Sequence, residues 1–175
     1  MSTPIHPVDL HSPAERARHL LGALKDAGTT SLTGTPCGIL APLWRQAHDK
    51  TSDLSLVTVS REDTALAFAA GEALAGGHPA VLMQNSGFGN CVNVMASLIC
   101  PYDLHVTLVI SLRGTGNDTT PENSAMGATT ASILSHWGIA TTLLAAPGDL
   151  LIPRNLARNG PSAVLIAPEY FGWCP

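Results

Sequence analysis

The sequence predicts an α/β fold of three layers, in which a six-stranded, mostly parallel sheet carries helices on both faces. Six short apolar, β-branched runs alternate with longer helical stretches along the 175 residues. The runs are apolar throughout rather than strictly alternating, which is typical of strands that are covered on both faces. Right-handed crossovers between such strands place helices on each side of the sheet. We expect one domain over residues 13–175, preceded by a flexible arm over residues 1–12.

The first helix has a recognisable beginning and end. Ser12 is expected as its N-cap, Pro13 as its first helical residue, and Glu15 as the partner of Ser12 in a capping box. The helix runs to about Ala27, and Gly28 ends it. The expected strands are 30–33, 54–59, 80–84, 105–112, 140–145 and 162–167, and the expected helices between them are 39–49, 62–76, 88–99, 124–137 and 149–158. The aromatic C-terminal stretch APEYFGWCP is interpreted as a packing anchor rather than a ligand site.

Composition excludes several classes of function. Hydrophobic residues make up 45% of the chain and charged residues 13%, which suffices for a large core and suggests that part of the surface is covered by another chain. The net charge is −4, and the nine Lys and Arg residues are scattered, so neither nucleic acid nor an anionic membrane surface is an expected partner. No apolar stretch approaches the ~20 residues that span a bilayer. The four cysteines show no CxxC spacing, which indicates free thiols in a reducing compartment and a soluble, cytoplasmic protein.

Familiar catalytic motifs are missing. SGFGN lacks the third glycine of a dinucleotide-binding loop, no Walker motif occurs, and no GxSxG surrounds Ser86. The seven histidines form no HxxxH pair, so a protein-bound metal is not expected. Cys91 and Cys100 are interpreted as small packing residues. Asp118 and Glu122 form a possible carboxylate pair in a loop, for which a solvated surface is the preferred interpretation.

Polar and glycine residues gather where the expected strands end. In open parallel sheets, ligands bind beyond the carboxyl ends of the strands. The loops at that edge are 34–38, 60–63, 85–90, 113–123 and 147–149. We therefore expect the functional site at this edge.

Taken in order, three of these loops and their flanks resemble a known family. TGTPCGILAPLW, SREDTALAFAAGEALAGGHPAVLMQNSGFGNCVNVMASL and RGTGNDTTPENSAMG resemble the pyrimidine-binding domain of thiamine-diphosphate-dependent 2-oxoacid decarboxylases. The nearest branch is that of the phosphonopyruvate and sulfopyruvate decarboxylases, and the resemblance spans residues 14–168.

The resemblance implies a catalytic role for Glu62, the first residue of an expected helix. In this family the matching glutamate contacts N1′ of the cofactor's aminopyrimidine, which helps a ring nitrogen to remove the weakly acidic thiazolium proton. A carboxyl group shares a proton well where water is excluded, because desolvation raises its pKa. The alternative is that Glu62 only complements the helix dipole. Asp63 is then a capping or surface residue, and Arg61 neutralises local charge.

Further site residues follow from the same resemblance. The implied cofactor-binding residues besides Glu62 are Gly34, Pro36, Gln84, Asn85, Ser86 and Gly87, and the implied substrate-binding residues are Thr35, Cys37, Arg113 and Asn123. An ordinary strand-to-helix turn remains an alternative for residues 84–87. Arg113 suits an oxyanion because its guanidinium is planar, although an arginine that only closes its loop is an equal alternative. Asn123 stands where phosphonopyruvate decarboxylases tend to carry a histidine, which argues against a phosphonate substrate.

The resemblance also implies a partner subunit. Mg²⁺ and the diphosphate of this cofactor need a GDG…N motif, and the sequence contains only Gly148-Asp149 followed by leucines. We therefore expect a β-type subunit to hold Mg²⁺, in an α2β2 assembly or a multiple of it. The implied reaction converts a pyruvate with an anionic C3 group into an aldehyde and CO₂. A carboligating thiamine-diphosphate enzyme subunit and a non-catalytic, flavodoxin-like binding domain are the alternatives.

Overall fold

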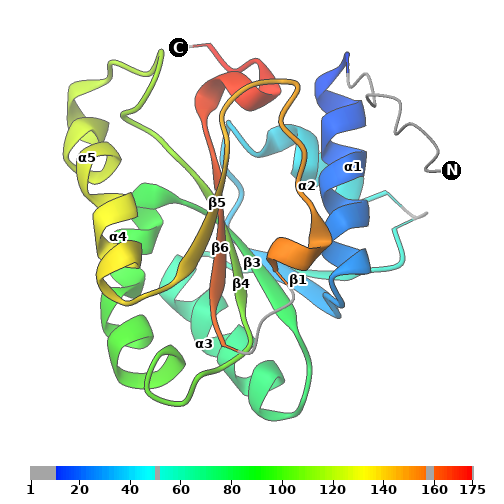
Figure 1. Ribbon diagram of the computed structural model, residues 1–175, viewed down its shortest axis with the longest axis vertical. Helices are drawn as coiled ribbons and strands as arrows, with labels where there is room; N and C mark the ends of the chain where they lie inside the picture. The colour runs from blue at the N-terminus through cyan, green and yellow to red at the C-terminus, as the bar shows by residue number, and fades with distance from the viewer. Residues whose placement is uncertain (1–10, 50–51, 157–159, 175) are drawn as a thin grey trace, which may run out of the picture.

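A computed structural model describes residues 11–49, 52–156 and 160–174, and within them the chain forms one six-stranded sheet in the order β2-β1-β3-β4-β6-β5 (Figure 1). Every neighbouring pair of strands is parallel. The strands are β1 (Ser31–Gly34), β2 (Ser55–Thr58), β3 (Pro79–Gln84), β4 (Thr107–Ser111), β5 (Ala140–Leu144) and β6 (Ser162–Ile166). The predicted fold class is confirmed.

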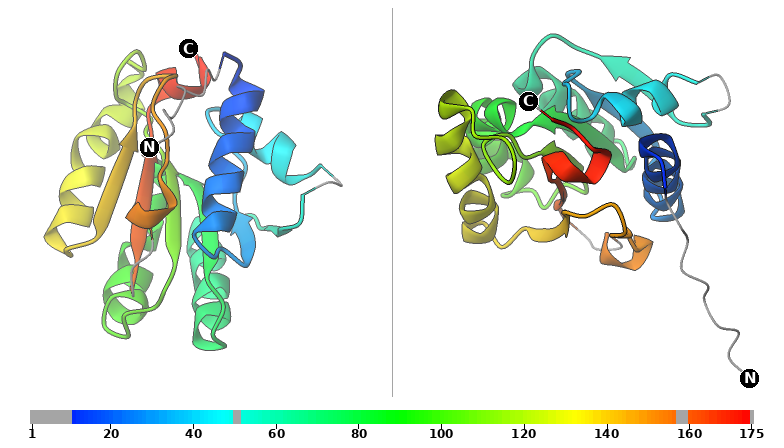
Figure 2. Two further views of the ribbon diagram at one scale, coloured as in Figure 1. Left: turned by 45° about the vertical axis from the view of Figure 1, so that its right-hand side comes forward. Right: turned by 90° about the horizontal axis from the view of Figure 1, so that it is seen from above.

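Helices cover both faces of the sheet, as Figure 2 shows from two directions. The helices are α1 (Pro13–Asp26), α2 (Ala41–Ala47), α3 (Glu62–Leu74), α4 (Asn85–Val94), which a π-helical turn over Met95–Ile99 continues, and α5 (Pro121–His136). One hydrophobic cluster joins α3, α4 and α5 to the sheet, and a second joins α1, α2 and the C-terminal turn Pro168–Phe171 to the other face. The result is the expected arrangement of three layers.

The start of α1 is built as the sequence predicts. The Glu15 backbone N–H donates to Ser12 Oγ at 3.2 Å, and the Ser12 backbone N–H donates to Glu15 Oε2 at 2.8 Å. Pro13 occupies the first turn, where its missing N–H costs nothing. This capping box satisfies two backbone N–H groups at the start of α1.

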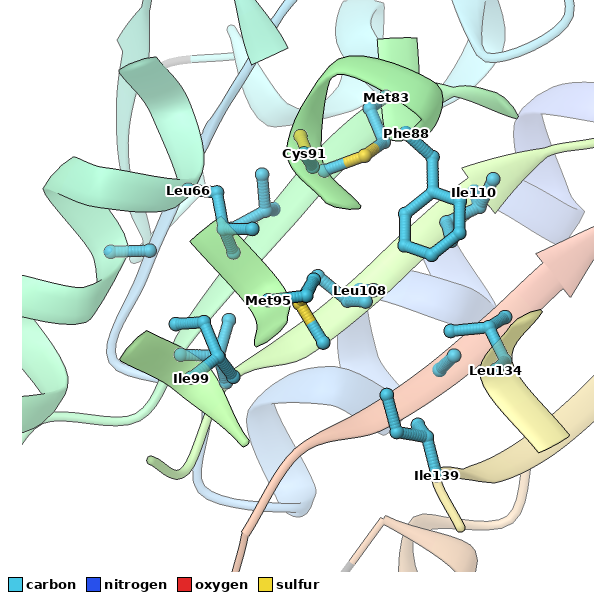
Figure 3. Packing of buried hydrophobic residues seen from close by; sticks show 14 of the residues in the cluster. Leu66, Met83, Phe88, Cys91, Met95, Ile99, Leu108, Ile110, Leu134 and Ile139 are labelled. Atoms are coloured by element: carbon cyan, nitrogen blue, oxygen red, sulfur yellow. The ribbon is translucent and has the colours of Figure 1, made fainter. Parts of the chain in front are cut away.

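The hydrophobic cluster under α3, α4 and α5 anchors α4 to the sheet (Figure 3). Phe88 is fully buried and lies edge-on to Trp137, with ring centroids 6.3 Å apart. Cys91 is also fully buried, and burial raises the pKa of its thiol to about 12. All four cysteines are free, and Cys91 and Cys100 both pack against this cluster, as predicted.

Three expected helices differ from the structure by three residues or more, and the other elements differ by one or two. The helix expected over 149–158 is wrong: its described part contains only a 3₁₀ turn over Pro153–Asn155. Pro153 disfavours helix in the residue before it, and Asp149 Oδ2 accepts the backbone N–H groups of Ala145 and Ala146, which closes a turn instead. Residues 157–159, like residues 1–10 of the expected arm, lie outside the described residues. Helix α5 begins at Pro121 and α4 at Asn85, each three residues earlier than expected, so the predicted cofactor turn is the first turn of α4.

No helix in the described part of the chain combines the length and the apolar character needed to cross a membrane.

Candidate active site

The side chain of Glu62 lies on the first turn of α4. Glu62 is the first residue of α3, where the extended backbone of Arg61 forms the N-cap. A Cβ atom built on Gly87 would overlap the Glu62 carboxyl carbon and Cγ. Gly87 therefore leaves the space that the Glu62 carboxyl group occupies, and no other residue could stand at 87 without moving it.

The surroundings of Glu62 suit a carboxyl group that takes part in chemistry. The unpaired backbone N–H groups at the amino end of α4 favour negative charge beside Gly87. Phe88 and Cys91, in the same helix, are fully buried and form an apolar floor behind it. Glu62 itself is half-buried, so one side is anchored by the protein and the other stays accessible.

The two charged neighbours of Glu62 bind each other. Arg61 Nε and Nη2 donate to the two carboxylate oxygens of Asp63 at 3.0 and 2.8 Å. The hydrogen bonds from Arg61 lower the pKa of Asp63 from its usual value. Arg61 occupies the N-cap position of α3, and Asp63 Oδ1 accepts the Thr64 backbone N–H in the first turn at 2.9 Å. The pair leaves Glu62 as the carboxyl group that turns toward α4.

Asn85 joins the ends of β3 and β4. The Asn85 side chain is fully buried, its Nδ2 donates to the carbonyl oxygen of Arg113 at 2.8 Å, and its Oδ1 accepts the Arg113 backbone N–H at 3.1 Å. These bonds continue the ladder beyond the last strand pair, Gln84 with Ser111. The structure thus gives Asn85 a positioning role, and its contact with a cofactor stays a prediction.

Gln84 and Ser86 lie at the rim of the site. Gln84 Nε2 donates to the exposed Ser86 Oγ at 2.6 Å. Both side chains are accessible from the edge of the sheet, where the sequence places the cofactor turn.

The loop after β1 forms a second wall. A Cβ atom at Gly34 would collide with the Leu82 carbonyl oxygen, which also accepts the Thr35 backbone N–H at 3.1 Å. Thr35 Oγ1 donates to the Val59 carbonyl oxygen at 3.4 Å. Pro36 is exposed and borders a shallow hollow of about 390 Å³ between this loop and α2.

Cys37 is a neutral thiol in this wall. Its Sγ lies 3.2 Å from Ser111 Oγ, and burial raises the thiol's pKa. A protonated thiol serves as a weak hydrogen-bonding group rather than as a nucleophile. Ser111 is fully buried at the end of β4, and no sequence signal marks it because it closes an apolar run.

Arg113 is held from two sides. Its Nε donates to Asp118 Oδ2, and its guanidinium carbon lies 4.5 Å from the centroid of the Trp173 ring. Its Nη2 lies 3.5 Å from Thr120 Oγ1. Among the described residues, Nη1 has no hydrogen-bond partner, so the end of the guanidinium stays open.

The solvated-surface interpretation is wrong for Asp118. Asp118 is buried and accepts the backbone N–H groups of Gly114 and Thr120 at 2.9 and 3.2 Å. The bond from Arg113 holds the pKa of Asp118 well below its usual range. Asn123 Nδ2 also reaches Asp118 Oδ2, at 3.4 Å. A carboxylate that closes its own loop in this way is buried because the loop supplies donors that replace water.

The site is therefore a carboxyl group on a helix end, flanked by loops from three adjacent strands and one arginine. These groups gather beyond the carboxyl ends of the strands, where parallel α/β folds bind ligands. Residues 15–110 match the family described as thiamine pyrophosphate enzyme, N-terminal TPP binding domain, and the chain belongs to this family. The matched range contains Glu62 and Gly87 but ends before Arg113.

Within this family, the chain is similar to two curated decarboxylases. The chain is 39% identical over 154 residues to the sulfopyruvate decarboxylase subunit alpha of Methanothermobacter thermautotrophicus, covering 85% of this chain and 93% of the relative. It is 32% identical over 136 residues to the phosphonopyruvate decarboxylase of Streptomyces hygroscopicus, covering 77% of this chain but only 34% of that protein. The chain thus spans nearly all of the first relative and about a third of the second.

Solved structures share the fold. Benzoylformate decarboxylase from Polynucleobacter necessarius superimposes with a TM-score of 0.67 at 16% identity, over 90% of this chain and 30% of that one. A split-gene transketolase superimposes with a TM-score of 0.65 at 11% identity, over 90% of this chain and 50% of the other. At these identities the likeness concerns the fold alone. The sheet has one strand more than the five-stranded flavodoxin-like order, which together with the family match argues against the flavodoxin-like alternative.

Proposed function

We propose that this chain is the α-type subunit of a split thiamine-diphosphate-dependent decarboxylase that converts a pyruvate with an anionic C3 group, such as sulfopyruvate, into an aldehyde and CO₂. The observation that carries the proposal is the contact of the Glu62 carboxyl group with Gly87, because the resemblance implies that this carboxyl group meets the aminopyrimidine of the cofactor. The similarity over nearly the full length of a sulfopyruvate decarboxylase subunit alpha supports the substrate class.

Bound thiamine diphosphate supplies the electron sink on which a 2-oxoacid can lose CO₂. Glu62 fits this group, since its carboxyl is anchored at one side and accessible at the other. In the proposed role it holds a proton at the pyrimidine nitrogen N1′. Gln84, Ser86 and the loop residues Gly34 and Pro36 border the same edge and would orient the ring.

The substrate side is assigned to the loops after β1 and β4. Arg113 would bind the anionic C3 group through the open end of its guanidinium, since a planar fork matches an oxyanion. Thr35 and Cys37 would supply neutral hydrogen-bonding groups. Asn123 cannot transfer a proton as a histidine does, so it is assigned to orientation and the product proton must come from elsewhere.

The remaining cofactor contacts are assigned to a β-type partner that carries GDG…N and holds Mg²⁺ and the diphosphate. The relative of matching length is named a subunit alpha, which supports a separate partner chain. Helix α3, which presents Glu62, also exposes Phe68 and Leu74, 50% and 64% accessible. Such large apolar side chains on one helix suit a subunit contact. We assign an α2β2 assembly, or a multiple, in a reducing cytoplasm.

The test is activity of the assembled enzyme with Glu62→Gln. Glutamine keeps the size of the side chain but cannot share the carboxyl proton, so we expect turnover of sulfopyruvate to fall by roughly 100-fold or more. Co-purification with the β-type chain should be unchanged. Full turnover by the variant would refute the proposal. Product analysis with and without an acceptor aldehyde separates decarboxylation from carbon–carbon bond formation.

A further inference from the structure

The C-terminal segment returns to the site after β6. Tyr170 and Phe171 are buried in the core, so the turn Pro168–Phe171 is anchored to the sheet. Gly172 adopts a left-handed conformation with φ of 69°, which reverses the chain. The Trp173 backbone N–H then donates to the Pro168 carbonyl oxygen at 3.0 Å. The place of Trp173 is therefore determined by the core and not by a loose chain end.

The same segment binds the loop after β4. Glu169 Oε1 accepts the Asn117 backbone N–H at 2.6 Å, and Asn117 Nδ2 donates to the Trp173 carbonyl oxygen at 3.0 Å. A Cβ atom at Gly116 would overlap the Glu169 carboxylate. On its other side, Trp173 Nε1 lies 3.4 Å from the position of a Cβ atom at Gly38, in the loop after β1. Trp173 thus stands between two of the loops that carry the predicted substrate residues.

The indole of Trp173 covers one face of the Arg113 guanidinium, at 4.5 Å from carbon to ring centroid. Asp118 binds the Nε side of the same group. The ring contact and the ion pair together restrict the movement of the guanidinium. Its remaining free edge carries Nη1, and the Arg113 side chain is 21% accessible. An arginine held like this loses little side-chain entropy when an anion binds.

We propose that Trp173 is a specificity-determining residue, which holds Arg113 in the plane where its open end meets the anionic C3 group of the substrate. This inference rests on the proposed function and extends it to a residue outside the matched family range, 15–110. The indole also keeps water from one face of the guanidinium, and a less hydrated arginine pairs more strongly with an oxyanion. A 2-oxoacid that is uncharged at C3 has no anionic C3 group for Arg113 to bind, so its turnover should not depend on the contact with Trp173.

The test compares Trp173→Ala with Trp173→Phe in the assembled enzyme. Steady-state kinetics are measured with sulfopyruvate, which is anionic at C3, and with 2-oxobutanoate, which is neutral there. For Trp173→Ala we expect KM for sulfopyruvate to rise roughly tenfold, with kcat and the constants for 2-oxobutanoate little changed. Trp173→Phe keeps an aromatic face and should restore most of the loss. Tyr102→Ala removes an exposed aromatic ring near the opposite edge of the sheet and serves as the matched control.

A second measurement does not depend on turnover. Sulfoacetate carries the sulfonate and a carboxylate but cannot be decarboxylated by this chemistry, and its binding to the assembled enzyme is measured by calorimetry. Trp173→Ala should weaken it by roughly tenfold and Tyr102→Ala should not. If the parent enzyme decarboxylates sulfopyruvate and Trp173→Ala matches it in KM and in sulfoacetate binding, the inference is wrong while the proposed function stands. If the parent assembly turns over no anionic 2-oxoacid, the proposed function itself fails.

Discussion

The carboxyl group of Glu62 fills the volume that a side chain at Gly87 would need. One residue begins α3 and the other lies in the first turn of α4, so the two helices meet at this point. The contact explains why a glycine stands inside a helix, where it normally costs about 1 kcal/mol relative to alanine. Glycine at position 87 lowers the helix propensity of α4, but it leaves the space that the Glu62 carboxyl group occupies.

Replacing Gly87 with alanine should therefore displace Glu62. We expect Gly87→Ala to lower kcat of the assembled enzyme by roughly 100-fold, because a carboxyl group moved by about 1 Å no longer meets its partner atom. Gly89→Ala is the matched control, since a Cβ atom there meets only the flexible end of Met126 at 3.4 Å. Equal activity of the two variants would show that the contact between the Glu62 carboxyl group and Gly87 does not affect catalysis.

The two hydrogen bonds between the Asn85 side chain and the Arg113 backbone should stabilise the fold. Asn85→Ala leaves the backbone N–H and carbonyl of Arg113 without partners in a buried place, so unfolding should become easier by about 1–3 kcal/mol. Urea denaturation of the full chain measures this difference. Asn90→Ala, on the exposed side of the same helix, should change stability little. If Asn85→Ala leaves the free energy of unfolding unchanged, the two hydrogen bonds to Arg113 do not form in solution.

Asp118 should make the stability of the fold depend on pH in the acid range. Its pKa in the folded chain lies well below that of an unfolded aspartate, about 3.9, so ionised Asp118 stabilises the fold above about pH 4. That contribution is lost as the pH falls below this value toward the folded-state pKa. Asp118→Asn should therefore flatten the fall in stability between about pH 4 and the acid limit of folding, and weaken Arg113 binding of anions. Glu122→Gln, at an exposed position, should keep the parent dependence; identical acid curves for parent and Asp118→Asn would contradict the assignment.

His78 predicts a second, separate pH effect at the amino edge of the sheet. Its ring stacks on His105 with centroids 3.4 Å apart, and its Nε2 lies 3.0 Å from Thr107 Oγ1. Burial, and then the charge of His105, lower the pKa of His78 to about 4 from 6.5. The folded state thus resists protonation, so stability is fully present above about pH 6.5 and falls as the pH drops from there to about 4, by on the order of 3 kcal/mol.

The check is the stability of His78→Gln across that range. The variant should be less stable at pH 7 but lose less on acidification to pH 4 than the parent. His136→Gln, exposed at the end of α5, should keep the parent slope. An unchanged slope in His78→Gln would show that another group titrates.

The fold and part of the site follow from sequence patterns that act locally. Apolar runs of strand length between helical stretches predicted the parallel sheet, and the spacing of Ser12 and Glu15 predicted a capping box that the structure contains. Glu62 was predicted as a site residue because its surrounding residues resemble a family. The helix expected over 149–158 does not form in its described part, because Pro153 disfavours helix in the residue before it and Asp149 closes a turn.

The sequence by itself determined the class of fold and the family, and it predicted the carboxyl group of the site, since these depend on residues that are neighbours in the chain. Only the tertiary structure decided that Gly87 seats Glu62, that Asn85 holds the backbone of Arg113 across 28 positions, and that Trp173 covers its guanidinium. It also decided that Asp118 is buried rather than solvated. The physical reason is that each of these contacts joins separate loops, and their meeting depends on how parallel strands align their carboxyl ends. The sequence predicted that these loops share one edge of the sheet, but not which side chains meet there.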